Sequence, residues 1–285
     1  MTVIKKRRLA EKAQESVGVS QRVLARKFHI SAPYVNKILR KSGIYCFKRE
    51  KVPLVSETQL VNQRLRVGRL YREVLSIGDG NPHFVMDDES YFTLRGSDMH
   101  QNDQYYATCK YAAEPSIRYA CTAKFEQRLM MWIAISQNGI SRPFFCPAGG
   151  ALNGEIYRKE CIQKRLMPFL QKYHADNHYL FWPDLASYHY ASVTQKLFQE
   201  SGIKLGLKEK NPPNCPQLRP VEDFWGILKQ AVYSGGWEAE NHDQLKRRIL
   251  YRLHRINKTM LYNMMKNVKS KLSQARDNGV NYLLH

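Results

Sequence analysis

The stretch HFVMDDESYFTLR (83–95) decides the fold, because it sets acidic residues inside an apolar β pattern. We interpret it as a strand that runs into a second strand. The apolar run RLMMWIAISQNG (128–139) ends on Asn-Gly and predicts a buried strand followed by a turn. Further strands are expected at 142–149 and 178–184, and helices at 64–77, 155–173, 191–202, 219–233 and roughly 240–275. The chain from residue 63 onward is therefore predicted to be mixed α/β.

The net charge of +20 is concentrated at the two ends of the 285-residue chain. Residues 1–60 hold 14 Lys and Arg against 4 Asp and Glu, and residues 241–285 hold 10 against 2. This distribution favours a polyanionic partner, with nucleic acid first and an acidic membrane surface second. The six cysteines form no C-x-x-C pair, and no secretory signal or membrane-spanning run is seen. We therefore expect an intracellular protein with reduced thiols and no membrane association.

The segment SQRVLARKFHISAPYVNKILRK (20–41) fits a helix-turn-helix. Ser20 and Ser31 can each cap a helix, with Val23, Leu24 and Phe28 inward on the first. His29 stands in the turn, where glycine is usual. A basic second helix of this kind can enter the DNA major groove. The residues expected to contact DNA are Gln21, Arg22, Ser31, Tyr34, Asn36, Lys37, Arg40 and Lys41. An ordinary helical hairpin with a solvated face is the alternative.

Three acids stand where metal-dependent phosphodiester chemistry would need them. Asp88 lies on the strand at 83–95, Asp184 ends the strand at 178–184, and Glu222 lies in the first turn of the helix at 219–233. Two divalent ions about 4 Å apart, held by converging carboxylates, can activate an attacking oxygen and stabilise a leaving one. Taken alone the pattern is weak, because a chain with 25 acids contains many such triples.

Three longer stretches of sequence that contain these acids strengthen the interpretation of a metal site. The strings MDDESYF (86–92), FWPDLASYHY (181–190) and NPPNCPQLRPVEDFW (211–225) resemble the catalytic blocks of Tc–mariner transposases, S-D-E-S-x-F, a strand ending in D, and S-P-x-L-N-P-I-E-x-x-W. The resemblance places the metal carboxylates at Asp88, Asp184 and Glu222. The 37 residues between the last two acids resemble the subgroup with an Asp-Asp-Glu triad of that interval. Asp87 stays open as an alternative to Asp88.

The resemblance implies an RNase H-like fold, a mixed five-stranded sheet flanked by helices, behind an N-terminal helix-turn-helix domain. It implies two Mg²⁺ (or Mn²⁺) ions with Asp88 bridging. The implied reaction is cut-and-paste transposition, with cleavage of transposon inverted repeats in double-stranded DNA and joining of 3′ ends to a TA target. A homodimer in the nucleus is expected. His189 is expected either to contact the scissile phosphate or to order the start of the next helix.

The expected domains are a helix-turn-helix domain (1–41), a basic linker (42–62), an RNase H-like catalytic domain (63–240) and a basic helical C-terminal extension (241–285). Relatives usually carry two helix-turn-helix units, and this sequence has room for one. A transposase-derived DNA-binding protein that has lost mobility is therefore the alternative function. A nuclease acting on RNA is a third reading, which the helix-turn-helix disfavours because side chains cannot read the major groove of A-form RNA.

Overall fold

The computed structural model describes residues 2–15, 19–46, 55–96, 114, 126–147 and 150–284. They form two compact units, Met1–Leu54 and Val55–His285. The first unit contains helices α1 (Val3–Glu15), α2 (Gln21–Phe28) and α3 (Ala32–Lys41). The side chains of Ser20 and Ser31 accept hydrogen bonds from Val23 N and Tyr34 N, so both predicted N-caps are confirmed.

The small core of this first unit differs in one position from the prediction. Leu24 and Ala25 are buried, but Val23 is 46% exposed and does not face inward. A helix of eight residues has room for only a narrow buried face, and Ala25 takes the position nearest α3 because its side chain is small. His29 ends α2 in the left-handed conformation (φ 54°), which explains why glycine is usual in this turn.

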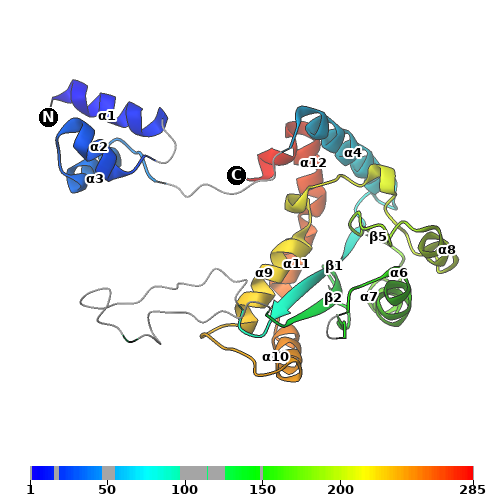
Figure 1. Cartoon of the computed structure of the whole chain (residues 1–285). Helices are drawn as coiled ribbons and strands as arrows, with labels where there is room; N and C mark the ends of the chain where they lie inside the picture. The colour runs from blue at the N-terminus through cyan, green and yellow to red at the C-terminus, as the bar shows by residue number, and fades with distance from the viewer. Residues whose placement is uncertain are drawn as a thin grey trace. The chain divides into compact units, whose positions relative to one another are not determined.

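The second unit is built on a mixed five-stranded sheet (Figure 1). Its strands are β1 (His83–Thr93), β2 (Arg128–Ser136), β3 (Gly139–Ile140), β4 (Phe144–Phe145) and β5 (Tyr179–Phe181). They run in the order β3-β2-β1-β5, with β4 also paired to β2. β1 is antiparallel to β2 and parallel to β5. The expectation that residues 83–95 contain two strands is wrong, because β2 pairs with β1 continuously from Val85 to Thr93.

Side chains alternate along β1 and β2, so both faces of the sheet carry apolar residues, and helices cover both faces. Phe84, Met86 and Phe92 share one apolar core with α4 (Glu57–Leu75), α9 (Pro220–Val232), α10 (His242–His254), α11 (Lys258–Lys266) and α12 (Val268–Asn278). Val85 and Trp132 face the opposite core. That core is closed by α6 (Gly154–Ile156), a π-helical stretch η1 (Tyr157–Leu166), α7 (Met167–Tyr173) and α8 (Ser192–Glu200). The short 3₁₀ turns are η2 (Lys208–Lys210), η3 (Pro216–Leu218) and η4 (Val280–Leu284).

Two expected boundaries differ from the structure. The linker was expected to reach residue 62, but α4 begins at Glu57, where Ser56 and Gln59 form a reciprocal capping box. Residues 47–54 of the expected linker lie outside the described residues. The boundary at residue 240 separates no two units, because Leu245, Leu261 and Leu272 are fully or almost fully buried in the same core as β1. Within the described ranges, no helix combines the length and apolarity that a bilayer span requires.

Candidate metal centre

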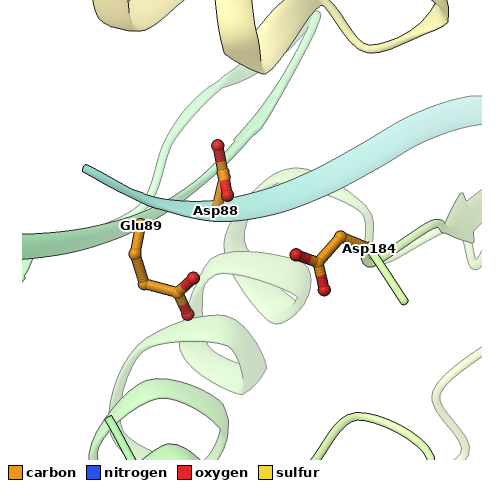
Figure 2. Close-up of side chains that lie close together, drawn as sticks. All are labelled: Asp88, Glu89 and Asp184. Atoms are coloured by element: carbon orange, nitrogen blue, oxygen red, sulfur yellow. The ribbon is translucent and has the colours of Figure 1, made fainter. Parts of the chain in front are cut away.

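Strand β1 directs its consecutive acids to opposite faces of the sheet. Asp88 faces α9, and the indole Nε1 of Trp225 on that helix donates to Asp88 Oδ2 at 2.8 Å. Glu89 leaves β1 on the other side (Figure 2). Asp184 follows β5, which runs parallel to β1, so both strands deliver an acid to the same edge. The strand pairing, together with α9, therefore explains why these distant residues meet.

Three carboxylates converge at this edge. Asp88, Glu89 and Asp184 each offer an oxygen atom, and these atoms lie within 4.8 Å of one another. Burial and the charge of Glu222 raise the pKa of Asp88 to about 7. Burial raises the pKa of Glu89 to about 7 as well, although Tyr188 OH donates to its Oε1 at 2.7 Å. The sequence predicted Asp88 and Asp184, and it missed Glu89 as their neighbour.

Glu222 lies beside this group. It is the third residue of α9, its side chain is exposed, and its oxygens are outside the converging group of three. Its charge nevertheless contributes to the raised pKa of Asp88. Desolvation of the part of Glu222 that lies against the protein raises its own pKa, the charge of Arg219 acts to lower it, and the charge of Asp184 acts to raise it. The structure therefore brings Glu222 into the electrostatic neighbourhood of Asp88 and Asp184, one helical turn before the Trp225 contact.

A buried arginine joins the ends of both strands. Arg219 is 8% exposed, and its guanidinium donates to the backbone carbonyls of Asp87 (3.0 Å) and Trp182 (3.2 Å). The guanidinium also lies over the Trp182 ring, 5.8 Å from its centroid. Its positive charge acts to lower the pKa of Asp88, Asp184 and Glu222. No sequence pattern had indicated a role for Arg219.

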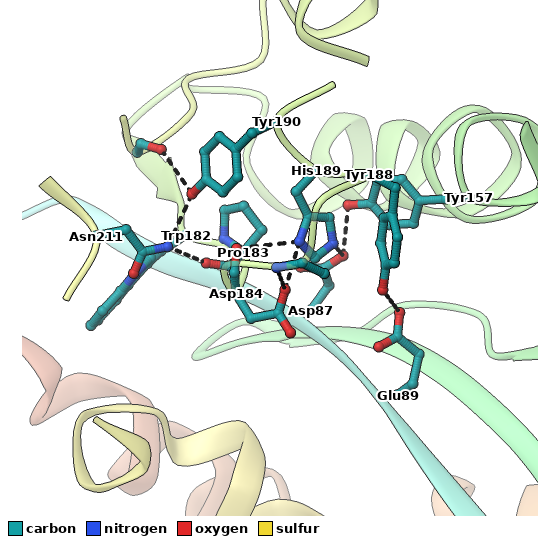
Figure 3. A network of polar contacts seen from close by, with 12 residues as sticks. Asp87, Glu89, Tyr157, Trp182, Pro183, Asp184, Tyr188, His189, Tyr190 and Asn211 are labelled. Carbon is teal, nitrogen blue, oxygen red and sulfur yellow. Dashed lines mark hydrogen bonds and ion pairs between the residues drawn. The ribbon is translucent and has the colours of Figure 1, made fainter. Parts of the chain in front are cut away.

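His189 joins two acids in a buried polar network (Figure 3). Its Nδ1 lies 2.7 Å from Asp184 Oδ1, and its Nε2 lies 3.6 Å from Asp87 Oδ2. Burial acts to lower the pKa of His189, but the charge of Asp87 and hydrogen bonding to Asp184 outweigh burial and raise the pKa to about 10. Burial would raise the pKa of Asp184, yet hydrogen bonding to His189 lowers it overall. His189 therefore contacts the Asp184 carboxylate and lies shortly before α8, the helix whose start it was expected to order. Its expected contact with the scissile phosphate stays a prediction.

Asp87, the alternative to Asp88, is excluded as a ligand by its surroundings. Its side chain is fully buried on the opposite face of β1. The Oδ2 atom accepts hydrogen bonds from Trp132 Nε1 (3.1 Å) and Tyr157 OH (2.8 Å). The Asp87 carboxylate is therefore held in the protein interior by these two hydrogen bonds.

The three converging carboxylates fit a hard divalent cation. Mg²⁺ and Mn²⁺ prefer oxygen ligands, and carboxylates are their usual protein ligands. Burial raises the pKa of Asp88 and of Glu89, so the folded chain disfavours ionised carboxylates at this place. A bound cation would supply the missing positive charge.

Comparison with solved structures identifies the fold. The chain superposes on the Mos1 transposase paired-end complex with left transposon end at a TM-score of 0.75 and 16% identity, covering 98% of this chain and 79% of that one. The Mos1 strand transfer complex gives 0.72 and 14%, covering 96% and 77%. The chain has the mariner transposase fold. The catalytic domain of Mos1 mariner transposase alone gives 0.59 at 12% identity, covering 81% and 98%. No protein-family model and no curated protein matches the sequence.

The mariner fold confirms the predicted RNase H-like sheet, and the first unit carries the predicted DNA-contact residues. Arg22, Lys37, Arg40 and Lys41 are exposed, as a phosphate-contacting set needs to be. Gln21, Tyr34 and Asn36 are half-buried, and Gln21 Nε2 lies 3.5 Å from Asn36 Oδ1. Ser31 uses its hydroxyl as the N-cap of α3. The contacts of all eight residues with DNA stay predictions.

Proposed function

We propose that this chain is a metal-dependent DNA transposase. It cuts at transposon ends in double-stranded DNA and joins the 3′ ends to a TA target by two-metal-ion phosphoryl transfer. The observation that carries this proposal is the convergence of Asp88 and Asp184 at one edge of a mariner-type sheet, with Glu222 beside them. The similarity to Mos1 complexes with Mn and with Mg supports the choice of metal.

In this proposal Asp88, Asp184 and Glu222 hold Mg²⁺ or Mn²⁺, two ions in all, with Glu89 close by. The bound ions would activate the attacking oxygen and offset charge on the leaving 3′ oxygen. Trp225 holds Asp88 by a hydrogen bond, which keeps this carboxylate turned toward α9. Arg219 favours the ionised form of the acids by its positive charge, which partly offsets the effect of burial, and it ties β1 to the segment after β5.

The partners follow from the same proposal. The exposed cations of α2 and α3 would contact the phosphates of transposon inverted repeats, while polar residues of α3 would reach base edges. Two ends must be brought together before strand transfer, so we propose a homodimer, and the Mos1 paired-end complexes are consistent with this. Action on chromosomal DNA implies the nucleus.

Nicking of supercoiled plasmid by the full chain with Mg²⁺ or Mn²⁺ tests the proposal. Asp184→Asn and Glu222→Gln should each reduce nicking by at least about 100-fold, because metal ligation is lost. Asp223→Asn is the matched control, since Asp223 is exposed beside Glu222 and should tolerate the change. Glu89→Gln, run in parallel, decides whether the third ligand is Glu222 or Glu89.

DNA binding, measured by fluorescence anisotropy on a labelled duplex, should be unchanged in all four variants. Nicking that survives Asp184→Asn would overturn the metal assignment. Tight binding by the wild-type chain without nicking in either metal would favour the immobile DNA-binding protein. Preferential cutting of RNA–DNA hybrids would favour the nuclease.

A further inference from the structure

Asp87 is a buried acid for which the proposed reaction has no use. Its side chain is fully buried, between the strand face and η1. Hydrogen bonds from Trp132 and Tyr157 reach only Oδ2, and Oδ1 is buried with no hydrogen-bond partner among the described residues. A carboxylate in so dry a place is strongly disfavoured unless a cation lies close to it.

The basic side chain that faces Asp87 is His189. The imidazole is 1% exposed, and its Nε2 lies 3.6 Å from Asp87 Oδ2, within ion-pair distance but without a hydrogen bond. The rings of Tyr157 and Tyr188 pack edge-on against it, with centroids 4.7 and 4.5 Å away. These aromatic rings pack on the imidazole beside its contact with Asp87.

The other ring nitrogen of His189 contacts Asp184, the metal-ligand candidate that follows β5. His189 Nδ1 lies 2.7 Å from Asp184 Oδ1, which also accepts the backbone N–H of Ala186 at 2.8 Å. Asp184 Oδ2 accepts no hydrogen bond from any residue that the structure describes. One oxygen of Asp184 is therefore held by the protein, and the other is left for a cation (Figure 3).

We propose that Asp87 is a positioning residue, which acts through His189 to hold Asp184 with Oδ2 directed at the cation site. The inference rests on the proposed function, because it takes Asp184 as a metal ligand. Residues that orient a metal ligand without touching the metal commonly change metal affinity 10- to 100-fold when mutated. Asp87 is placed to act in this way, because the ring of His189 lies between it and Asp184.

A double-mutant cycle separates this role from simple loss of folding. The variants are Asp87→Asn, which keeps an acceptor for Trp132 and Tyr157, His189→Gln, and both together. In EDTA, His189→Gln leaves the buried Asp87 carboxylate without its His189 contact, and Asp87→Asn leaves His189 with Asp184 as its one carboxylate contact, whereas the double variant removes the Asp87–His189 contact from both sides at once. We expect the double variant to unfold with an equilibrium constant at least about tenfold lower than the product of the single effects predicts.

Binding of Mn²⁺ to the full chain, followed by the electron paramagnetic resonance signal of free Mn²⁺, gives the second readout. Asp87→Asn should weaken Mn²⁺ binding about tenfold in the wild-type background and have no effect in the His189→Gln background. His174→Gln is the control, since His174 is equally buried but lies directly after α7 and contacts Ser136 instead. It should bind Mn²⁺ like the wild type. If a single variant fails to fold, the double variant should still bind Mn²⁺ about tenfold more weakly than the wild type.

Equal losses from Asp87→Asn in both backgrounds, or Mn²⁺ binding within twofold of the wild type, would overturn the inference and leave the proposed function standing. An Asp184→Asn variant measured alongside should lose the site. If it binds Mn²⁺ as tightly as the wild type, the metal site of the proposed function falls, and the positioning role with it.

Discussion

Replacement of Arg219 by methionine should destabilise the second unit strongly and in a pH-dependent way. The change leaves the backbone carbonyls of Asp87 and Trp182 without their hydrogen-bond donor, which costs about 1–3 kcal/mol of stability for each carbonyl that stays unsatisfied. It also removes the cation that acts on Asp88, Asp184 and Glu222. Removing one partner from a buried ionic group typically costs about 3–5 kcal/mol in total. We therefore expect a loss of about 3–5 kcal/mol at pH 8 without metal.

The loss should be smaller at pH 5. Asp88 has a pKa of about 7, so it is ionised in the folded state at pH 8 and mostly protonated at pH 5. The ionic part of the Arg219 contribution therefore shrinks as pH falls, while the two carbonyl contacts remain. A decrease of the loss by about 1–2 kcal/mol between pH 8 and pH 5 is expected, which corresponds to roughly one pKa unit of interaction.

Urea unfolding followed by tryptophan fluorescence measures both values. All four tryptophans lie after residue 54, so the signal reports on the second unit alone. Arg247→Met on the exposed side of α10 is the matched control and should cost less than about 0.5 kcal/mol. A loss below 1 kcal/mol for Arg219→Met would refute the structural role. A loss of equal size at both pH values would refute the electrostatic one.

Three further predictions concern single groups. Burial, followed by the charge of His83, lowers the pKa of His174 to about 4, so between pH 6.5 and 4 only the unfolded chain takes up this proton. The free energy of unfolding should therefore fall by about 3 kcal/mol over that range, and His174→Gln should remove this part of the pH dependence in urea melts. Asp88→Asn should raise metal-free stability at pH 8 by up to about 4 kcal/mol and give almost no gain at pH 4, because the folded state disfavours ionised Asp88 only above the unfolded pKa. An equal gain at both pH values in the same melts would contradict this. Lys37→Ala and Arg40→Ala should each reduce by about 1 the slope of log affinity against log salt in anisotropy titrations, and an unchanged slope would remove that residue from the phosphate contacts.

Most of the fold was predictable because local signals agreed with the tertiary structure. The alternation in β1, the Asn-Gly turn after β2 and the serine caps of α2 and α3 are all local, and the structure contains each of them. The exposure of Val23 was not predictable, since a helix of only two turns does not itself define which neighbour covers it. The start of α4 was missed although Ser56 and Gln59 carry a capping box in the sequence.

The candidate site was predictable only in part. Asp88 and Asp184 could be placed because each stands on or directly after an apolar strand, where parallel pairing brings strand ends together. Glu89 was missed because alternation places it on the face opposite Asp88, and only the structure shows that its long side chain still brings an oxygen within 4.8 Å of those of Asp88 and Asp184 (Figure 2). Arg219 was missed because its partners are backbone carbonyls of two distant segments, and no sequence pattern marks a carbonyl.

Two residues beside the candidate site stand where the chain departs from the blocks that it resembles. Asp87 replaces the serine of S-D-E-S-x-F, and Arg219 replaces the asparagine of S-P-x-L-N-P-I-E. One departure adds a buried acid and the other a buried base, and Arg219 donates to the backbone carbonyl of Asp87 itself. The two charges act on different groups, because the side chain of Asp87 contacts His189 on one face of β1, whereas the charge of Arg219 acts on Asp88 and Glu222. What links the two replacements is the backbone of β1, since the carbonyl that Arg219 holds belongs to the residue whose side chain contacts His189.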